Sequence, residues 1–266
     1  MDVRLDGRVV LVTGSTQGVG QAVALEAARS GASGVMITGR DAAKGQAALD
    51  GLRQCGVEAA FIAADLVDVS APERIFSAAL AQFGRVDALV NAAGMTDRAS
   101  LLDATPELWD TLFAVNARAA FFLMQKFVTH LKDREGPGSA VNILSINVHG
   151  GTPALAVYAA TKAALALATK NAAHAHRFDR IRINGINLGW TDTPAERHMQ
   201  SVTLKKGDGW LDEAAAIMPF GRLLSADDVA RLTTFLLSDA SVPMTGALID
   251  QEQSVVGPRD SIDARA

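Results

Sequence analysis

Apolar and polar positions follow two recurring patterns along the chain. Short apolar runs rich in Val, Ile and Leu are each followed by a longer, Ala-rich segment with apolar positions at helical spacing. The first pattern predicts strands and the second predicts helices. We expect strands over residues 8–13, 34–39, 57–65, 86–94, 139–145, 181–188 and 247–250. We expect helices over residues 18–30, 41–54, 72–83, 106–130, 154–177 and 227–237, with Ser70 as the N-cap of the third and Pro106 in the first turn of the fourth.

The order of these elements predicts an α/β fold. Strand runs that are apolar throughout are typical of strands buried on both faces. Regular alternation of strand and helix connects parallel strands. We therefore expect a single-domain, doubly wound parallel sheet of the Rossmann type, with helices on both faces, over residues 1–266.

Composition narrows the function classes. The chain of 266 residues is 49% hydrophobic and 20% charged with a net charge of -4, which favours a soluble protein and gives no basic block for nucleic acid. No apolar run reaches the roughly 20 residues of a membrane helix, and no signal peptide is recognised. The single cysteine, Cys55, excludes an intrachain disulfide and suits the cytoplasm. One cysteine and scattered histidines predict no metal site.

A glycine-rich turn follows the first predicted strand. The sequence Thr13-Gly14-Ser15-Thr16-Gln17-Gly18-Val19-Gly20 lies between that strand and a predicted helix. Glycines let the backbone approach a pyrophosphate, and the helix amino terminus offers free N–H groups to it. This placement in the first strand–helix unit predicts a dinucleotide site.

The end of the second strand bears on the choice between NADP and NAD. An acidic residue there would bind a ribose 2′-hydroxyl, whereas Gly39-Arg40 leaves space and a cation for a 2′-phosphate. NADP(H) is therefore the preferred cofactor. NAD stays open, because Arg40 would also stack on an adenine. The acidic Asp41 complicates this choice; alternatively, it is the N-cap of the next helix.

Tyr158 is the only tyrosine, and Lys162 follows it at a spacing that puts both side chains on one helix face. A free phenol has a pKa of about 10. A lysine cation one turn away favours the phenolate, so we expect it to lower the pKa of Tyr158 toward the working range. The hydroxyl of Ser145, at the end of the fifth apolar run, would hold a substrate oxygen. These three groups suit proton transfer at a carbon that gains or loses hydride.

Taken together, these motifs resemble those of the short-chain dehydrogenase/reductase family. The resemblance runs from about residue 5 to residue 250 and includes TGxxxGxG at 13–20, Asn-Ala-Ala-Gly at 91–94, Asn116, Ser145, Tyr158-x-x-x-Lys162 and Gly189 through Thr193. It implies an NAD(P)-dependent oxidoreductase acting on CH–OH groups. The catalytic residues would be Asn116, Ser145, Tyr158 and Lys162, with Asn116 anchoring a water that connects Lys162 to solvent. The cofactor contacts would be Gly14, Ser15, Gln17, Gly18, Val19, Gly20, Arg40, Asp65, Leu66, Asn91, Ala92, Gly94, Tyr158, Lys162, Gly189, Thr191 and Thr193.

Three positions depart from the family pattern. Leu188 stands where a proline usually precedes Gly189, and Ala92 stands where a second asparagine is usual. Near the carboxyl terminus, Asp250-Gln251-Glu252 replaces the usual Asp-Gly-Gly. None of these changes removes a catalytic group.

Substrate choice would come from the residues after Ser145 and from a lid at about 190–218. Asn147, His149, Gly150 and Gly151 lie in the first patch, and the lid carries Glu196, His198, Gln200, Lys205, Lys206 and Trp210. Polar groups beside an aromatic platform favour a small hydroxylated substrate such as a sugar or polyol. One alternative is a 3-oxoacyl-type reductase, for which Lys205 and Lys206 are the only nearby cationic pair. Another is a non-catalytic NAD(P)-binding sensor on the same fold.

The helix over 154–177 carries small residues that would allow close packing against another helix: Ala156, Ala159, Ala160, Ala163, Ala164 and Ala166. The resemblance implies a homotetramer or homodimer through this helix and the helix of Asn116. Alternatively, the alanines pack on the sheet.

Overall fold

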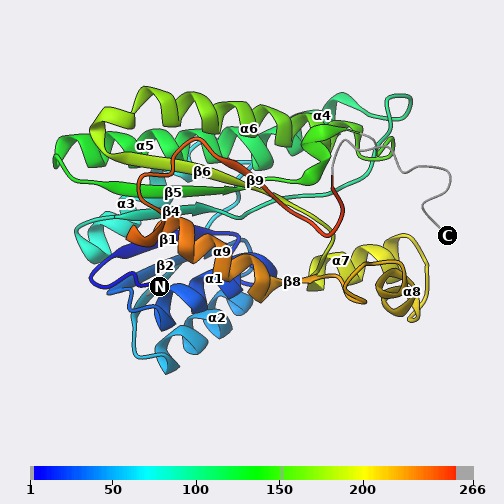
Figure 1. Cartoon of the computed structure of the whole chain (residues 1–266), viewed down its shortest axis with the longest axis horizontal. Helices are drawn as coiled ribbons and strands as arrows, with labels where there is room; N and C mark the ends of the chain where they lie inside the picture. Colours follow the sequence, from blue (N-terminus) through cyan, green and yellow to red (C-terminus); the bar gives the residue numbers. More distant parts are fainter. Residues whose placement is uncertain (1–2, 151, 256–266) are drawn as a thin grey trace.

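The computed structural model describes residues 3–150 and 152–255. Its centre is a seven-stranded parallel sheet, with helices on both faces (Figure 1), as the sequence predicts. The strand order is β3-β2-β1-β4-β5-β6-β9. The strands are β1 (Val9–Thr13), β2 (Gly34–Gly39), β3 (Glu58–Ala63), β4 (Ala88–Asn91), β5 (Gly138–Ile143), β6 (Ile181–Leu188) and β9 (Leu248–Gln251).

Two apolar layers hold the helices on the sheet. One contains α1 (Gly18–Arg29), α2 (Ala42–Gln54) and α9 (Ala226–Leu237), which lie below the sheet in Figure 1. The other contains α3 (Ala71–Phe83), α5 (Ala119–Asp133) and α6 (Ala156–Ala175), of which α5 and α6 run along the top of Figure 1. The central strands β1, β2 and β4 are buried on both faces, which explains their nearly continuous apolar sequences, whereas the edge strands β3 and β9 are partly exposed.

Most predicted boundaries agree with the structure to within two residues, but two local predictions are wrong. The helix expected over 106–130 consists of α4 (Pro106–Phe113), a π-helical turn (Ala114–Arg118) and α5. Ser70 occupies the N-cap position of α3, but its hydroxyl bonds Asp68 instead of the first-turn amides. Asp41 does cap α2, because its carboxylate accepts from the Ala43 and Lys44 amides.

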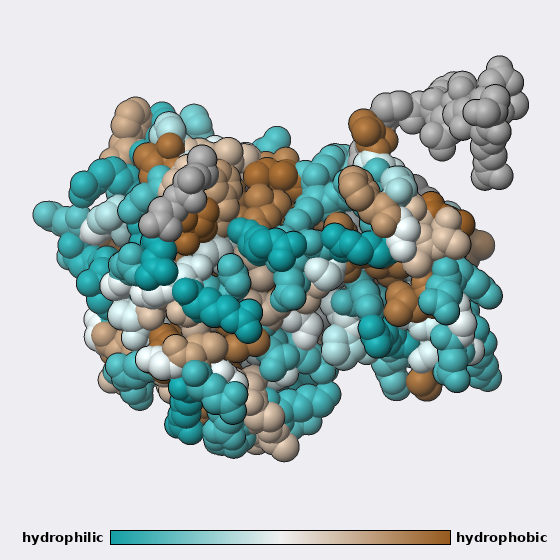
Figure 2. All heavy atoms as spheres, turned by 60° about the horizontal axis from the view of Figure 1, so that its bottom comes forward, coloured by the Kyte–Doolittle hydropathy of each residue, from teal (hydrophilic) through white to brown (hydrophobic). Residues whose placement is uncertain are grey.

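The segment after β6 forms a small lobe at the right of Figure 1. It contains β7 (Thr191–Asp192), α7 (Pro194–His198), a π-turn (Met199–Thr203) and α8 (Trp210–Ala216), and β8 (Leu224–Ser225) pairs with β7. Trp210, Ala214 and Leu223 form an apolar cluster there. Figure 2 shows further apolar side chains on the surface of this lobe, where Val202, Ile217 and Phe220 are exposed.

No helix within residues 3–150 and 152–255 is both long and apolar enough to cross a membrane. The same residues hold no group of three or more His, Cys, Asp and Glu side chains suited to a metal ion.

Candidate active site

The candidate site lies at the carboxyl ends of the central strands, where the sheet order changes direction between β1 and β4. A cleft of about 350 Å³ begins at the glycine-rich turn after β1 and reaches Tyr158 and Lys162 on α6. The cleft is lined by thirteen of the predicted cofactor residues: Gly14, Gln17, Gly18, Val19, Gly20, Arg40, Asp65, Leu66, Ala92, Gly94, Tyr158, Lys162 and Thr193.

The glycine-rich turn is shaped by steric limits. Gly14 has φ +63, and a Cβ there would lie 2.6 Å from the Ala93 Cα. A Cβ at Gly20 would lie 2.4 Å from the Gly14 carbonyl oxygen. Larger residues would therefore force this turn away from β4 and α1. No side chain caps the first-turn amides of α1, because Gln17, at the N-cap, makes no such bond. The turn thus offers free N–H groups at a helix amino terminus, which fits a pyrophosphate.

The far end of the cleft carries two cations. Arg40 lines it at the end of β2, and Lys44 lines it from the first turn of α2. The Lys44 ammonium donates to Gln17 Oε1 over 3.1 Å. Sequence reasoning missed Lys44, although its position in the helix turn after Gly39-Arg40 was the available signal. Gly39 itself offers no carboxylate, and a Cβ there would lie 2.6 Å from Thr16 Cγ2. This end therefore fits a 2′-phosphate better than a free ribose hydroxyl.

Four predicted cofactor residues do not line the cleft. Ser15 is fully buried, and its hydroxyl donates to Val12 O and accepts from Thr38 N. Asn91 donates to Asn142 Oδ1 beneath the end of β4. Thr191 donates to the carbonyl oxygen of Gly189. Their polar side chains are thus engaged within the protein, and Gly189 is covered by Glu252.

Two of the departures from the family pattern, Leu188 and Glu252, lie beside Gly189. The Glu252 carboxylate lies against Gly189, where a Cβ would be 2.3 Å from its Oε2 atom. It also accepts from the Trp190 amide over 3.2 Å and from the Gln253 amide over 2.5 Å. A long acidic side chain therefore holds the loop after β6, where the family usually has a proline and a glycine turn.

The catalytic candidates converge in the buried part of the site. Ser145, Tyr158 and Lys162 are 4%, 9% and 4% exposed, respectively. Ser145 hydrogen-bonds Tyr158, and its hydroxyl also accepts from the Asn147 amide and side chain. The Lys162 ammonium donates to Ile143 O over 2.8 Å and lies 5.8 Å from the centre of the Tyr158 ring.

The pKa of Tyr158 does not follow the prediction. Burial raises the pKa of the phenol, the Ser145 hydrogen bond lowers it in part, and the Glu196 charge raises it further. The neighbouring Lys162, whose own pKa burial lowers to about 8, does not prevent this rise. In this state Tyr158 is a neutral phenol, which is the proton-donating form.

Asn116 lies in the π-turn between α4 and α5. Its side-chain oxygen accepts from Met95 N over 2.8 Å, and its amide donates to Met95 O and to Thr161 Oγ1. It therefore ties the loop after β4 to α6, one residue from Lys162. The extra backbone residue of the π-turn brings this side chain to the site, a detail that the helical pattern does not reveal.

The residues considered for substrate choice differ in their surroundings. Glu196 acts on Tyr158 through its charge and accepts from Trp190 Nε1 over 2.8 Å and from Gln200 Nε2 over 2.5 Å. Trp210 is 5% exposed inside the apolar cluster of the lobe, so the expectation of an open aromatic platform at this residue is wrong. His198, Lys205 and Lys206 are exposed, and His149 pairs with Asp250 instead of facing solvent alone.

Known proteins match this architecture over nearly the whole chain. The family model described as Enoyl-(Acyl carrier protein) reductase matches residues 14–251. The short-chain dehydrogenase/reductase FrzI of a Cladobotryum species is 34% identical, with 94% of this chain and 96% of that protein covered. The chain belongs to the short-chain dehydrogenase/reductase family.

Other relatives and solved structures vary in substrate. The versicolorin reductase stcU of Emericella nidulans is 30% identical, over 92% of this chain and 94% of that protein. L-sorbose reductase from Gluconobacter frateurii, solved with NADPH and L-sorbose, superimposes with a TM-score of 0.91 at 26% identity, over 97% of this chain and 100% of that chain. Actinorhodin polyketide ketoreductase, solved with NADPH, superimposes with a TM-score of 0.86 at 26% identity, over 93% of this chain and 96% of that chain. The fold is therefore shared by enzymes of sugars and of polyketides.

Proposed function

We propose that this protein is an NADP(H)-dependent oxidoreductase that interconverts a secondary alcohol and a carbonyl, with Tyr158 as the general acid/base. The observation that carries the proposal is the burial of Tyr158 and Lys162 in the same cleft as the glycine-rich turn, with Ser145 bonded to the phenol. A sensor that only bound a cofactor would not require this set, so the enzyme is favoured over the non-catalytic alternative.

NADP(H) is preferred over NAD(H) because Arg40 and Lys44 both line one end of the cleft, where Gly39 supplies no acid and the Asp41 carboxylate is engaged as the N-cap of α2. Two structural neighbours contain NADPH. When bound, the cofactor supplies or accepts the hydride. We expect the free amides at the start of α1 to hold its pyrophosphate and Lys162 to contact its nicotinamide ribose.

The remaining chemistry belongs to the side chains of this protein. The Ser145 hydroxyl holds the carbonyl oxygen of the substrate, and the neutral phenol of Tyr158 donates a proton to that oxygen during reduction. In the reverse direction Tyr158 accepts the proton. Lys162, whose pKa is about 8, is mostly protonated at neutral pH and stabilises the phenolate left behind. Asn116 fixes the loop and helix that flank Lys162.

The proposed substrate is a small hydroxylated carbonyl compound, such as a sugar or its polyol. Asn147 beside Ser145 and Glu196 near Tyr158 supply polar groups for substrate hydroxyls. The likeness to L-sorbose reductase supports this class. A 3-oxoacyl-type reductase is the alternative. We further propose that the segment 190–218 is the lid over this substrate, and that the enzyme works in the cytoplasm.

The test follows nicotinamide absorbance. Ketoses, polyols, secondary alcohols and 3-oxoacyl esters are each offered with NADP(H) and with NAD(H), and Tyr158→Phe serves as the catalytic blank. We expect NADP(H)-linked turnover of a hydroxylated compound by the natural protein alone. Turnover of 3-oxoacyl esters with no turnover of sugars or polyols would select the alternative substrate class. Equal turnover by the natural protein and the blank would contradict the mechanism.

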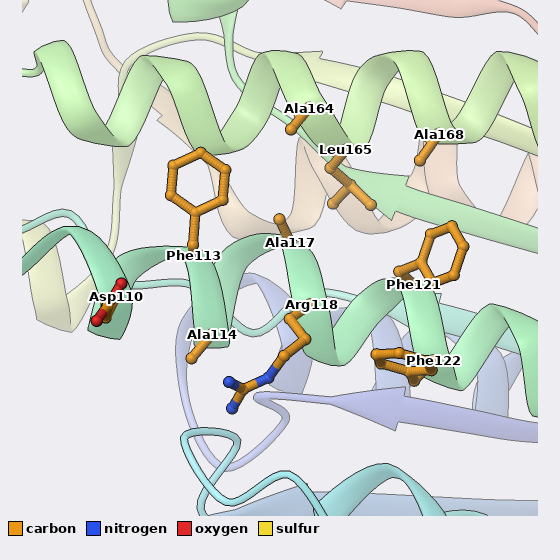
Figure 3. Close-up of a pocket in the computed structure, with 10 residues that line it drawn as sticks. All are labelled: Asp110, Phe113, Ala114, Ala117, Arg118, Phe121, Phe122, Ala164, Leu165 and Ala168. Carbon is orange, nitrogen blue, oxygen red and sulfur yellow. The ribbon is translucent and has the colours of Figure 1, made fainter.

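We also propose that two copies pair through α4, α5 and α6. A hollow of about 620 Å³ lies between these helices. Figure 3 shows Phe113, Ala117 and Phe121 facing Ala164, Leu165 and Ala168 across it. Phe121 and Phe122 are 49% and 42% exposed, and Ala163 and Ala164 are exposed as well. A second copy would cover this apolar face.

Light scattering after size exclusion tests the pairing. Phe121→Asp places a charge in the hollow, so we expect a homodimer or homotetramer to become smaller. Phe178→Asp is the matched control, because Phe178 is 86% exposed outside the hollow. A natural protein that runs as a monomer would refute the pairing.

A further inference from the structure

A second cavity lies at the opposite edge of the sheet from the cofactor cleft. It measures about 430 Å³ and is formed where the chain enters β1, β4, β5 and β6, which are neighbours in the sheet. The side chains that line it include two carboxylates, Asp87 and Asp239, and six arginines: Arg8, Arg85, Arg134, Arg177, Arg180 and Arg182. The chain as a whole carries a net charge of -4, so this concentration of cations is a local feature.

The two carboxylates are shared among the arginines. Asp87, whose side chain is 4% exposed, pairs with both Arg85 and Arg134. Asp239 pairs with Arg8 at 2.5 Å. The hydrogen bonds from Arg85, Val9 N and Arg134 outweigh burial and keep the pKa of Asp87 below its ordinary value, so it stays charged. Even so, one buried carboxylate faces two guanidinium groups, and positive charge remains in excess.

Arg182 adds a buried cation that meets neutral acceptors only. Its guanidinium donates to Ser241 Oγ and to three carbonyl oxygens, those of Leu237, Ser238 and Met244. None of the ion pairs among residues 3–150 and 152–255 includes it. Burial lowers the pKa of Arg182 and the neighbouring Arg8 charge lowers it further, while the Asp239 charge opposes this shift in part. Two like charges are therefore held close together at the wall of the cavity.

Arg177 and Arg180 stand at the mouth of the cavity, and both are exposed. Arg177 donates to His174 O and lies 4.5 Å from the Phe178 ring centre. Arg180 donates to Glu135 O over 3.2 Å. The carboxylate between them in sequence, Asp179, pairs with His176 and Lys132 instead. Both guanidinium groups therefore keep unused donors and an uncompensated charge.

We propose that this cavity binds a small, multiply charged phosphate compound. A concave wall of like charges focuses an anion-attracting field. Guanidinium groups match phosphate oxygens in pairs of parallel hydrogen bonds. The cavity volume is that of a small-molecule site and not of a flat protein interface. The ligand would neutralise the positive charge that six arginines carry in excess of two carboxylates. Its site would lie at the end of the strands remote from Tyr158.

Calorimetric titration with inorganic pyrophosphate tests the proposal. The protein is kept at low ionic strength in a buffer without phosphate, with saturating NADPH present to occupy the glycine-rich turn. We expect one saturable site that weakens as sodium chloride is added. The double variant Arg177→Ala/Arg180→Ala should weaken binding by about tenfold or more, because two charge-assisted contacts are lost. Both side chains bond only main-chain oxygens, so circular dichroism melting should be close to that of the natural protein.

The matched control is Arg29→Ala/Arg53→Ala, which removes the same charge from exposed positions on α1 and α2 outside the cavity. Pyrophosphate affinity should change less than twofold in this control. An absence of saturable binding, or equal weakening in both double variants, would overturn the proposal.

Discussion

The two edges of the central sheet present hydrogen-bond donors of different kinds. At the carboxyl edge, Gly14 and Gly20 expose backbone amides, and any added side chain would collide with the backbone. At the amino edge, six long arginine side chains supply the positive charge directly. At the glycine-rich turn the proposed anion contacts are backbone amides, whereas in the arginine cavity they are side chains. The two sites lie at opposite ends of the strands, since all strands of a parallel sheet start at one edge and finish at the other.

The largest expected difference concerns catalysis, which belongs to the carboxyl edge. Tyr158→Phe removes the proton donor, so we expect turnover to fall by about a thousandfold, within the range of general acid/base effects. NADPH binding, followed by fluorescence, should stay within a factor of about two. Pyrophosphate binding at the arginine cavity should be the same as in the natural protein. Turnover above about a tenth of the natural rate would remove Tyr158 from its proposed role.

The next effect concerns stability at the amino edge. Asp87→Ala leaves Arg85 and Arg134 without their shared carboxylate and removes the acceptor of the Val9 amide. We expect a loss of about 3 kcal/mol in the free energy of unfolding, measured in urea. Asp50→Ala, on the exposed surface of α2, should cost less than about 1 kcal/mol. Equal costs would mean that Asp87 behaves like a surface charge.

Asp87 also gives this edge a pH dependence with a defined sign. Its folded pKa lies below the ordinary value of 3.8. The stability it contributes is therefore present above that value and is lost as the pH falls through the lower folded pKa. The free energy of unfolding of the natural protein should fall more steeply than that of Asp87→Ala below about pH 4.

At the carboxyl edge, stability also rises with pH, but in the alkaline range. Burial lowers the pKa of Lys162 from 10.5 to about 8. Between these values the unfolded chain binds more protons than the folded chain, so this group makes stability rise with pH. We expect the natural protein to gain about 2 kcal/mol relative to Lys162→Met between about pH 7.5 and pH 10. Lys170→Met, an exposed site on α6, is the control and should show no such difference.

The smallest effect concerns cofactor choice. Arg40→Ala removes one of two cations at the end of the cleft, so we expect NADPH binding to weaken by about tenfold and NADH binding by less than about twofold. Binding is measured by fluorescence. The control is Arg53→Ala, an exposed position in the last turn of α2 that does not line the cleft. Equal weakening for NADPH and NADH would show that Arg40 stacks on the adenine instead of binding a phosphate.

Local patterns were sufficient for the fold. The apolar runs of β1, β2 and β4 were recognised because strands covered on both faces are apolar throughout, whereas the edge strands β3 and β9 are partly exposed. The π-turn at Asn116 was missed because one extra residue barely disturbs a helical pattern. Ser70 was misread as a cap because its hydroxyl has a closer partner in Asp68, and sequence spacing does not rank competing acceptors.

By itself, the sequence determined the Rossmann architecture, the glycine-rich turn, and the spacing of Tyr158 and Lys162, since each depends on residues close together in the chain. Only the tertiary structure decided what depends on distant segments. Burial on all sides raises the pKa of Tyr158 although a lysine lies one turn away. Lys44 joins Arg40, and Glu252 fills the loop at Gly189. The arginine cavity exists because four neighbouring strands begin at one edge, an adjacency set by the sheet order and invisible in the order of the chain.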